Sequence, residues 1–245
     1  MSVADSLTDL PSQPVDAPPY SFFRLPILFG PLCGYGWIPA SGGKLLRILL
    51  GTYEREQTAL FQELVRPGDE VLDIGAANGY YTLLAAQLTG PQGRVTSFEP
   101  DSVNAAYLRK HVSVNGLKHV SIHEWAIGNQ DGIMRFGTGS GTGTGRLTED
   151  GQRQVLVRRL DDLFPADDCT PNHLKIDVEG AEVSVLHGGE RLIQRARPTI
   201  FLSTHHPSVH QECCRILKQW NYSLSPIIGG NLETTTEVLA RPSAK

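Results

Sequence analysis

A carboxylate and two glycines come together in VLDIGAANGYYT, residues 71–82. Asp73 follows a short apolar run, and Gly75 and Gly79 come just after it. Glycine lets a backbone approach a ligand closely, and a helix that begins near Gly79 would point its amide groups at the same place. The stretch therefore predicts a ligand site where a buried strand turns into a helix.

Asp73 discriminates between two classes of ligand. A dinucleotide site would have the spacing G-x-G-x-x-G, whereas this turn has Ala77 in place of a middle glycine. A carboxylate would repel a pyrophosphate, but it would suit the ammonium group and the nearby sulfonium of S-adenosylmethionine. The pattern favours S-adenosylmethionine as the cofactor, and the structural alternative for Asp73 is a cap on the turn amides.

Glu99, in SFEP, follows the glycine turn by about twenty residues, the interval at which an acidic side chain accepts from ribose hydroxyls. Trp125 would stack on adenine, although an aromatic residue on a core strand is usually a packing residue. The residues predicted to bind the cofactor are Asp73, Gly75, Ala77, Asn78, Gly79, Glu99, Pro100 and Trp125.

Strands and helices are predicted to alternate, because short apolar runs alternate with segments of helical spacing. The predicted strands are 69–75, 93–100, 119–127, 173–180, 198–206, two in 221–240, and one that opens 153–164 before a short helical turn. The predicted helices are 53–65, 79–89, 101–116 with Asp101 as N-cap, 181–196 and 208–220. This order predicts an α/β, doubly wound, mostly parallel sheet. Its seven strands and antiparallel C-terminal hairpin strand are typical of the Rossmann-like class I methyltransferase fold.

Four blocks, PGDEVLDIGAANGYYT, SFEP, RRLDDLF and LKIDVEGAEVSVLHGG, resemble the FkbM family of S-adenosylmethionine-dependent methyltransferases. The resemblance runs from about Tyr53 to about His205. It implies a class I methyltransferase domain that usually transfers the methyl group to a hydroxyl oxygen of a sugar or polyketide-type natural product. It also implies that the aspartate and glycines of DIGAANG bind the methionine moiety, and that the glutamate of SFEP binds the ribose.

The chain departs from the family pattern at two places. The family commonly has DIGAN-x-G where this chain has DIGAANG, which leaves the role of Asn78 open. The family often has a glutamate before the histidine that ends the fifth strand, whereas LSTHH has Ser203 there. A base or metal role at that position is therefore not expected.

A hydroxyl acceptor loses a proton during methyl transfer, and a positioned base typically adds about 10²- to 10⁴-fold to the rate. The base should lie beyond the strand ends of 173–180 or 198–206, beside the cofactor. The residues predicted to be catalytic are Asp177, Glu179 and His205, with Glu182 and His206 as alternatives. Two of the carboxylates could instead hold Mg²⁺, a hard cation that prefers oxygen ligands.

Three further groups of residues are expected to be structural. Asp161 and Asp162 would cap a short helical turn, and His187 would suit the negative end of a helix dipole. The four cysteines lack CxxC spacing and are expected to be reduced thiols.

The chain divides by composition into three predicted parts. Residues 1–20 are proline-rich and predict a disordered arm, and residues 53–245 carry the methyltransferase domain. Between them, residues 21–52 predict a cover or lid, whose Tyr35 and Trp37 would either pack on the domain surface or form a substrate wall. A glycine-rich segment, 136–147, predicts a flexible surface loop.

Net charge and hydropathy restrict the partners. A formal charge of -4 gives no basic field to bind nucleic acid. The absence of a long apolar run and of a basic N-terminus predicts a cytoplasmic protein with no membrane partner. The expected partner is a small-molecule hydroxyl acceptor, and the oligomeric state stays open.

Two other functions also stay open. A nicotinamide-dependent reductase would share the sheet and Glu99, but it needs a glycine fingerprint that this chain lacks. A catalytically silent S-adenosylmethionine-binding domain would keep the glycine turn without turnover, and the departure at Ser203 is compatible with it.

Overall fold

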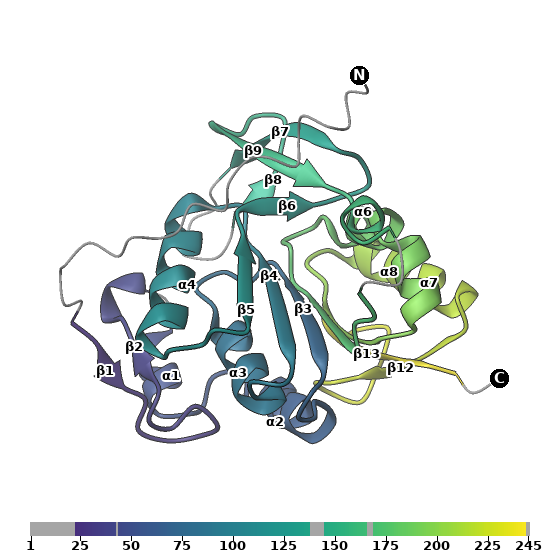
Figure 1. Ribbon diagram of the computed structural model, residues 1–245. Coiled ribbons are helices and arrows are strands. Elements are labelled where there is room, and N and C mark those ends of the chain that lie inside the picture. The colour runs from purple at the N-terminus through teal and green to yellow at the C-terminus, as the bar shows by residue number, and fades with distance from the viewer. Residues whose placement is uncertain (1–22, 43, 138–144, 166–168, 244–245) are drawn as a thin grey trace.

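The computed structural model of the chain describes residues 23–42, 44–137, 145–165 and 169–243 (Figure 1). The predicted arm, residues 1–20, lies outside the described residues, as does the centre of the predicted glycine-rich loop.

Seven strands form one central sheet in the order β12-β13-β11-β10-β3-β4-β5. The strands are β3 (Glu70–Ile74), β4 (Arg94–Phe98), β5 (Val120–His123), β10 (His173–Ile176), β11 (Thr199–Ser203), β12 (Tyr222–Pro226) and β13 (Glu237–Pro242). Neighbouring strands from β11 to β5 pair in parallel, whereas β13 is antiparallel to both β11 and β12. The predicted doubly wound fold with an antiparallel C-terminal hairpin strand is confirmed.

Helices cover both faces of this sheet (Figure 1). On one face lie α2 (Arg55–Leu64), α3 (Tyr80–Thr89) and α4 (Ser102–Val114), and on the other α6 (Glu182–Gly188), α7 (Glu190–Ala196) and α8 (Pro207–Gln219). Asp101 caps α4 as predicted, because its side chain accepts from the backbone amides of Val103 and Asn104. Two apolar clusters fill the spaces between the sheet and these two helix layers.

The alternation of side chains along β3 decides which layer each residue enters. Leu72 and Ile74 belong to the cluster beneath α6 and α8, whereas Val71 belongs to the cluster with Leu83 of α3. Asp73 is two residues beyond Val71 and therefore shares its face. The strand thus places a carboxylate inside the apolar layer beneath α3.

The helix predicted over 181–196 is wrong as a single element, because α6 and α7 meet at Gly189. The start of α7 is capped from elsewhere in the chain. Asp161 accepts from the backbone amides of Arg191 and Leu192, at 3.2 and 2.9 Å. Asp161 therefore caps α7, and not its own turn, α5 (Leu160–Leu163), where the sequence placed it.

A second sheet of four strands lies at one end of the central sheet, at the top of Figure 1. Its strands, in order, are β6 (Trp125–Ile127), β9 (Arg153–Arg158), β7 (Gly132–Gly137) and β8 (Arg146–Leu147). The single strand predicted over 119–127 is wrong, because it divides at Glu124 between β5 and β6, and β6 pairs with β9. The predicted loop 136–147 is wrong at both ends, which belong to β7 and β8.

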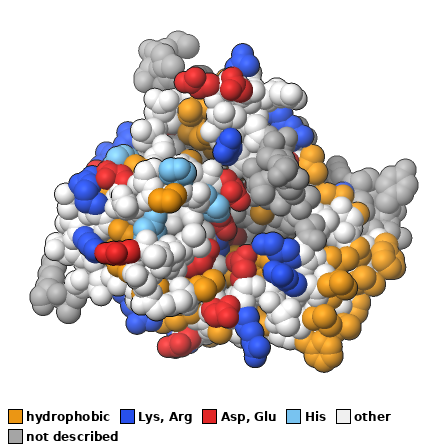
Figure 2. Space-filling view, turned by 180° about the vertical axis from the view of Figure 1, so that it is seen from behind, with side chains coloured by type: hydrophobic (Ala, Val, Ile, Leu, Met, Phe, Trp, Pro, Cys, Tyr) orange, Lys and Arg blue, Asp and Glu red, His pale blue; other side chains and the backbone are white. Residues whose placement is uncertain are grey.

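The cover segment packs on the central domain through short elements. These are β1 (Leu25–Pro26), β2 (Gly36–Trp37), a 3-10 helix (Pro39–Ser41) and α1 (Leu45–Leu49). Trp37 is 1% exposed and stacks on His111 of α4, with ring centroids 3.9 Å apart. Trp37 is thus a packing residue, the first of the two alternatives. Figure 2 shows a gathering of hydrophobic side chains at the lower right of one face of the molecule.

Two expectations about single residues are confirmed. His187 lies in the last turn of α6. The cysteines Cys33, Cys169, Cys213 and Cys214 are all free. No helix within the described ranges has both the length and the apolar content needed to cross a membrane.

Candidate active site

The turn between β3 and α3 passes close to the end of β10. Gly75 has a φ of 83°, and a Cβ there would lie 1.8 Å from the carbonyl oxygen of Asp177. Gly79 has a φ of 94°, and its Cβ would lie 2.3 Å from a methyl group of Leu108. Ala77, at φ 47°, adopts a left-handed conformation that costs about 1 to 3 kcal/mol in a residue with a side chain. Glycine is thus required at both ends of the turn. The backbone of Ala77, in the middle of the turn, is strained.

Asp73 lies beneath this turn and is only 2% exposed. Its Oδ2 accepts a hydrogen bond from the Thr82 hydroxyl at 2.6 Å, and that hydroxyl lies 2.9 Å from Oγ of Ser97. Burial raises the pKa of Asp73 to about 6, although the charge of Lys175 and the hydrogen bond from Thr82 act in the opposite direction. The Asp73 carboxylate is therefore already hydrogen-bonded to another side chain of the protein.

Glu99 follows β4 and connects the turn with the start of α4. Its Oε2 accepts from the backbone amide of Ala77 at 2.7 Å, and its Oε1 accepts from the amide of Asp101 at 2.9 Å. Burial raises the pKa of Glu99 to about 7, and the hydrogen bonds from these amides partly oppose that rise. Glu99 thus holds the glycine turn and the helix start at a fixed distance from each other.

A cavity lies at the carboxyl ends of β3, β4 and β10. Five of the predicted cofactor-binding residues line it, namely Gly75, Ala77, Glu99, Pro100 and Trp125. Asp177 and Glu179 line the same cavity from the end of β10. Its other lining residues within the described ranges are Ile74, Phe98, Asn104, Ala126, Ile127, Phe136, Gly145, Leu147, Val178 and Ala181. The cavity lies at the edge of the sheet where parallel α/β folds bind their ligands.

The second sheet supplies one wall of this cavity. Trp125 stacks on His123 at 4.5 Å between ring centroids, and the guanidinium of Arg158 lies 5.5 Å from the Trp125 ring. Phe136 and Leu147 belong to the same wall. The sequence does not predict a place for these two in the site, because the low-complexity glycine segment that separates them has no strand pattern.

Asn78 lies outside the cavity lining of the described residues and connects the turn with the cover segment. Its side-chain amide donates to the carbonyl of Ser41 at 2.9 Å. His111 donates from Nδ1 to the carbonyl of Asn78 at 2.8 Å and accepts at Nε2 from the amide of Ile38 at 3.0 Å. Burial lowers the pKa of His111 to about 4, so this bridging imidazole is neutral. The cover segment is therefore bonded to the glycine turn through the side-chain amide and the carbonyl of Asn78.

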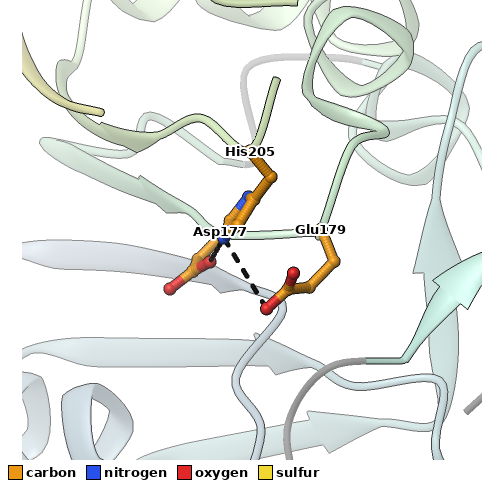
Figure 3. Close-up of side chains that lie close together, drawn as sticks. All are labelled: Asp177, Glu179 and His205. Carbon is orange, nitrogen blue, oxygen red and sulfur yellow. Dashed lines mark ion pairs between the residues drawn. The ribbon is translucent and has the colours of Figure 1, made fainter. Parts of the chain in front are cut away.

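The three residues predicted to be catalytic lie close together, namely Asp177, Glu179 and His205 (Figure 3). Nε2 of His205 lies 3.4 Å from Oδ1 of Asp177 and 3.6 Å from Oε1 of Glu179. The two carboxylates follow β10 and the histidine follows β11, and these strands pair in parallel. Figure 2 shows acidic and histidine side chains near one another in the middle of the molecular face.

The two alternative candidates lie apart from the cavity. Glu182 is fully buried and accepts from Nδ1 of His205 at 2.8 Å. His206 begins α8, where its Nδ1 accepts from the backbone amide of Ser208. Only one histidine of the pair therefore faces the cluster.

Charges within the cluster are strongly coupled. The hydrogen bond to Glu182 raises the pKa of His205 to about 9, against the effect of its partial burial. Partial burial alone would raise the pKa of Asp177, but the charges of Lys175 and His205 outweigh it and hold that pKa below its usual range. Partial burial raises the pKa of Glu179. A cationic imidazole thus lies between carboxylates at neutral pH.

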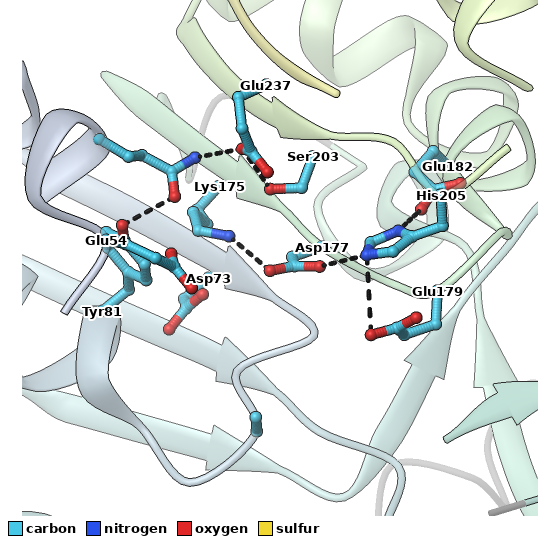
Figure 4. Close-up of polar contacts among 12 residues, drawn as sticks. Glu54, Asp73, Tyr81, Lys175, Asp177, Glu179, Glu182, Ser203, His205 and Glu237 are labelled. Carbon is cyan, nitrogen blue, oxygen red and sulfur yellow. Dashed lines mark hydrogen bonds and ion pairs between the residues drawn. The ribbon is translucent and has the colours of Figure 1, made fainter. Parts of the chain in front are cut away.

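A second polar chain lies beside the cluster (Figure 4). Lys175 donates to Oδ2 of Asp177 at 3.0 Å. Glu237 of β13 accepts from the Ser203 hydroxyl at 2.7 Å and from the side-chain amide of Gln57 at 2.9 Å. A carboxylate from another strand thus reaches Ser203, the position where the sequence lacks the expected acid. Glu237 is placed by β-strand pairing and no local motif marks it, whereas Lys175 stands in the block LKIDVEGAE without a role that its sequence position predicts.

The fold and the cavity define a class I methyltransferase domain. The chain belongs to the FkbM methyltransferase domain family, whose model matches residues 73–224. The family predicted from the sequence blocks is thereby confirmed.

Solved structures show the same fold. An FkbM methyltransferase from Methylobacillus flagellatus is 20% identical, with a TM-score of 0.53 over 80% of this chain and 52% of its own. A SAM-dependent O-methyltransferase from Thermotoga maritima is 14% identical, with a TM-score of 0.50 over 79% of this chain and 66% of its own. This chain therefore spans about half the length of the FkbM structure.

A curated relative matches over a shorter range. The protein-L-isoaspartate O-methyltransferase of Aeropyrum pernix is 40% identical over 55 residues, which are 22% of this chain and 21% of the relative. The match covers about one fifth of that protein.

Proposed function

We propose that this chain is an S-adenosylmethionine-dependent methyltransferase that methylates a hydroxyl oxygen of a small molecule. One observation carries the proposal: a single cavity is lined by Gly75 and Glu99 on one side and by Asp177 and Glu179 on the other. The first pair suits a nucleoside cofactor, and the second suits an acceptor that loses a proton. Membership of the FkbM family supports methyl transfer, and the resemblance implies a sugar or polyketide-type acceptor.

The cofactor would enter with its ribose at Glu99 and its adenine between Pro100 and Trp125. The methionine end would lie along the turn, where Gly75 lets the backbone approach it closely. Asp73 would act from beneath the turn, as a negative charge that favours the cofactor's ammonium and sulfonium groups without touching them. This role differs from direct contact, because the Asp73 carboxylate already accepts from Thr82.

The transfer is an in-line displacement at the methyl carbon. The acceptor oxygen forms a bond to that carbon, the carbon-sulfur bond breaks, and its electron pair stays on sulfur to give S-adenosylhomocysteine. The hydroxyl proton leaves toward the carboxylate of Glu179, which lines the cavity and lies beside the cationic His205. Alignment of the two reactants contributes about 7 to 11 kcal/mol in favourable cases, and a cavity at the strand ends provides it.

The test is calorimetric titration of the purified chain with S-adenosylhomocysteine and, separately, with NADH. We expect binding of S-adenosylhomocysteine alone, and at least tenfold weaker binding by Glu99→Ala. Glu124→Ala is the matched control, because Glu124 is half-exposed and pairs with Arg109 outside the cavity. Binding of NADH alone would favour a reductase instead.

Turnover is tested separately from binding. The chain is incubated with S-adenosylmethionine and each member of a panel of sugars and phenolic polyketides. We expect at least one hydroxyl acceptor to cause release of S-adenosylhomocysteine. Cofactor binding without release across the panel would support the catalytically silent domain. The cytoplasmic location and the absence of nucleic-acid and membrane partners stay predictions from the sequence.

A further inference from the structure

We propose that Asp177, Glu179 and His205 bind a zinc ion and leave one coordination position open toward the cavity. The three side chains each offer one ligand atom, and these atoms all lie within 4.8 Å of one another. Three protein ligands with one open position are the usual composition of a catalytic zinc site.

Two of the three ligand separations match tetrahedral coordination. Zinc binds nitrogen and oxygen at about 2.0 to 2.2 Å, so two ligands of a tetrahedral ion lie about 3.4 Å apart. Octahedral Mg²⁺, with bonds of about 2.0 to 2.1 Å, would bring them to about 3.0 Å. Nε2 of His205 is 3.4 Å from Asp177 and 3.6 Å from Glu179. An imidazole ligand also suits zinc better than it suits Mg²⁺, which prefers oxygen.

Glu182 is an independent sign of a metal site. It is fully buried, its Oε1 accepts from Nδ1 of His205, and its Oε2 has no hydrogen-bond partner among the described residues. A buried carboxylate on the far nitrogen of an imidazole fixes the ring and directs the other nitrogen at a metal. Burying a carboxylate with an unpaired oxygen costs free energy, and a dication nearby would compensate for it.

Asp177 is held in the same way from its other side. Lys175 is 2% exposed and donates to Oδ2 of Asp177, which leaves Oδ1 directed at His205. Each of these two ligands therefore has a partner that orients it. Such oriented ligands are common in metal sites.

The role of the ion rests on the proposed function. An acceptor hydroxyl at the open position would coordinate zinc, which lowers the pKa of bound water to about 7 and would likewise favour the alkoxide. With zinc bound, all three side chains of the cluster would be ligands, so the released proton would pass to solvent instead of to one of them. The ion would thus replace a protein base, with Glu179 as a ligand.

The test begins with the full chain, stripped of metal with EDTA and titrated calorimetrically with zinc chloride at neutral pH. We expect one zinc ion per chain and no comparable binding of magnesium chloride. Glu179→Gln and His205→Ala should each weaken zinc binding at least tenfold. His206→Ala is the matched control and should bind as the native chain does, because His206 caps α8 outside the cluster.

Glu182→Gln tests the positioning role. Loss of such a partner typically weakens metal binding by about 10- to 100-fold, and circular dichroism would show whether the variant folds. Cobalt in place of zinc should give the visible bands of a tetrahedral site without a thiolate charge-transfer band. No zinc binding, or equal binding by the Glu179 and His205 variants, or cobalt on cysteine thiolate would each overturn the proposal.

Titration with S-adenosylhomocysteine separates this proposal from the proposed function. Cofactor binding without zinc binding would remove only the metal site. Zinc binding without cofactor binding would leave the metal site standing and remove the methyltransferase assignment.

Discussion

The carboxylate of Glu99 accepts a hydrogen bond from the backbone amide of Ala77 at 2.7 Å, and both residues line the cavity. Ala77 is the left-handed residue in the middle of the glycine turn. One bond therefore holds the strained part of the turn against the residue proposed to bind the ribose. The acceptor that holds the turn is thus a buried acid whose protonation state changes near neutral pH.

That change of protonation state predicts how cofactor affinity changes with pH. Burial raises the pKa of Glu99 to about 7, and ribose hydroxyls need an acceptor, so cofactor binding favours the ionised carboxylate. Affinity for S-adenosylhomocysteine should fall as pH drops from 8 to 6, by at most about tenfold per pH unit. Calorimetry at pH 6, 7 and 8 measures this, and Glu99→Gln should bind weakly at all three values. An affinity of the native chain that does not vary with pH would contradict it.

Asp73 should make the folded chain less stable as pH rises. Its pKa is raised to about 6 in the folded state, above its ordinary value, so the folded state holds the proton more strongly than the unfolded state does. The free energy of unfolding therefore falls between about pH 4 and pH 6, by up to about 3 kcal/mol. Asp73→Asn, which can still accept from Thr82, should remove this part of the slope in urea denaturation. Parallel curves for the native chain and the variant would refute the assignment.

The sequence predicts the parts of the site that follow from strand ends. DIGAANG and SFEP end strands that become neighbours, so Gly75 and Glu99 could be placed at one edge of the sheet. Asp177 and His205 end two further neighbouring strands, which brings them together. The sequence does not decide whether Asp73 contacts a ligand or α3, because that depends on which face of the strand the side chain occupies.

The remaining parts depend on pairing between distant segments. Glu237 reaches Ser203 only because β13 inserts antiparallel beside β11. Phe136 and Leu147 reach the cavity because β8 pairs with β7, and β7 and β9 form a separate sheet with β6. No local pattern in the residues specifies either arrangement.

Gly75 should be the least replaceable glycine of the turn. In Gly75→Ala, the new Cβ would lie 1.8 Å from the backbone oxygen of Asp177, at a φ of 83° that side chains avoid. The variant should lose more than about 3 kcal/mol of stability or fail to fold. Gly68→Ala is the matched control, because φ is 89° there and nothing lies within 4 Å of the added Cβ. It should lose only about 1 kcal/mol by thermal denaturation. Equal losses of stability at the two positions would show that the strain of a positive φ, and not the clash with Asp177, causes the loss.

Substitution of Glu179 should lower the turnover rate without changing the affinity for the cofactor. It lines the cavity, yet it shares no hydrogen bond with Glu99 or the glycine turn in the described structure. With a hydroxyl acceptor found in the panel, Glu179→Gln should lower kcat by about 10²- to 10⁴-fold, because an amide neither accepts the proton nor binds the ion well. The affinity for S-adenosylhomocysteine should stay within about twofold, because its proposed contacts lie on the opposite wall. His206→Ala should turn over normally, since its side chain caps α8. A Glu179→Gln variant with native kcat would remove Glu179 from the chemistry of the transfer.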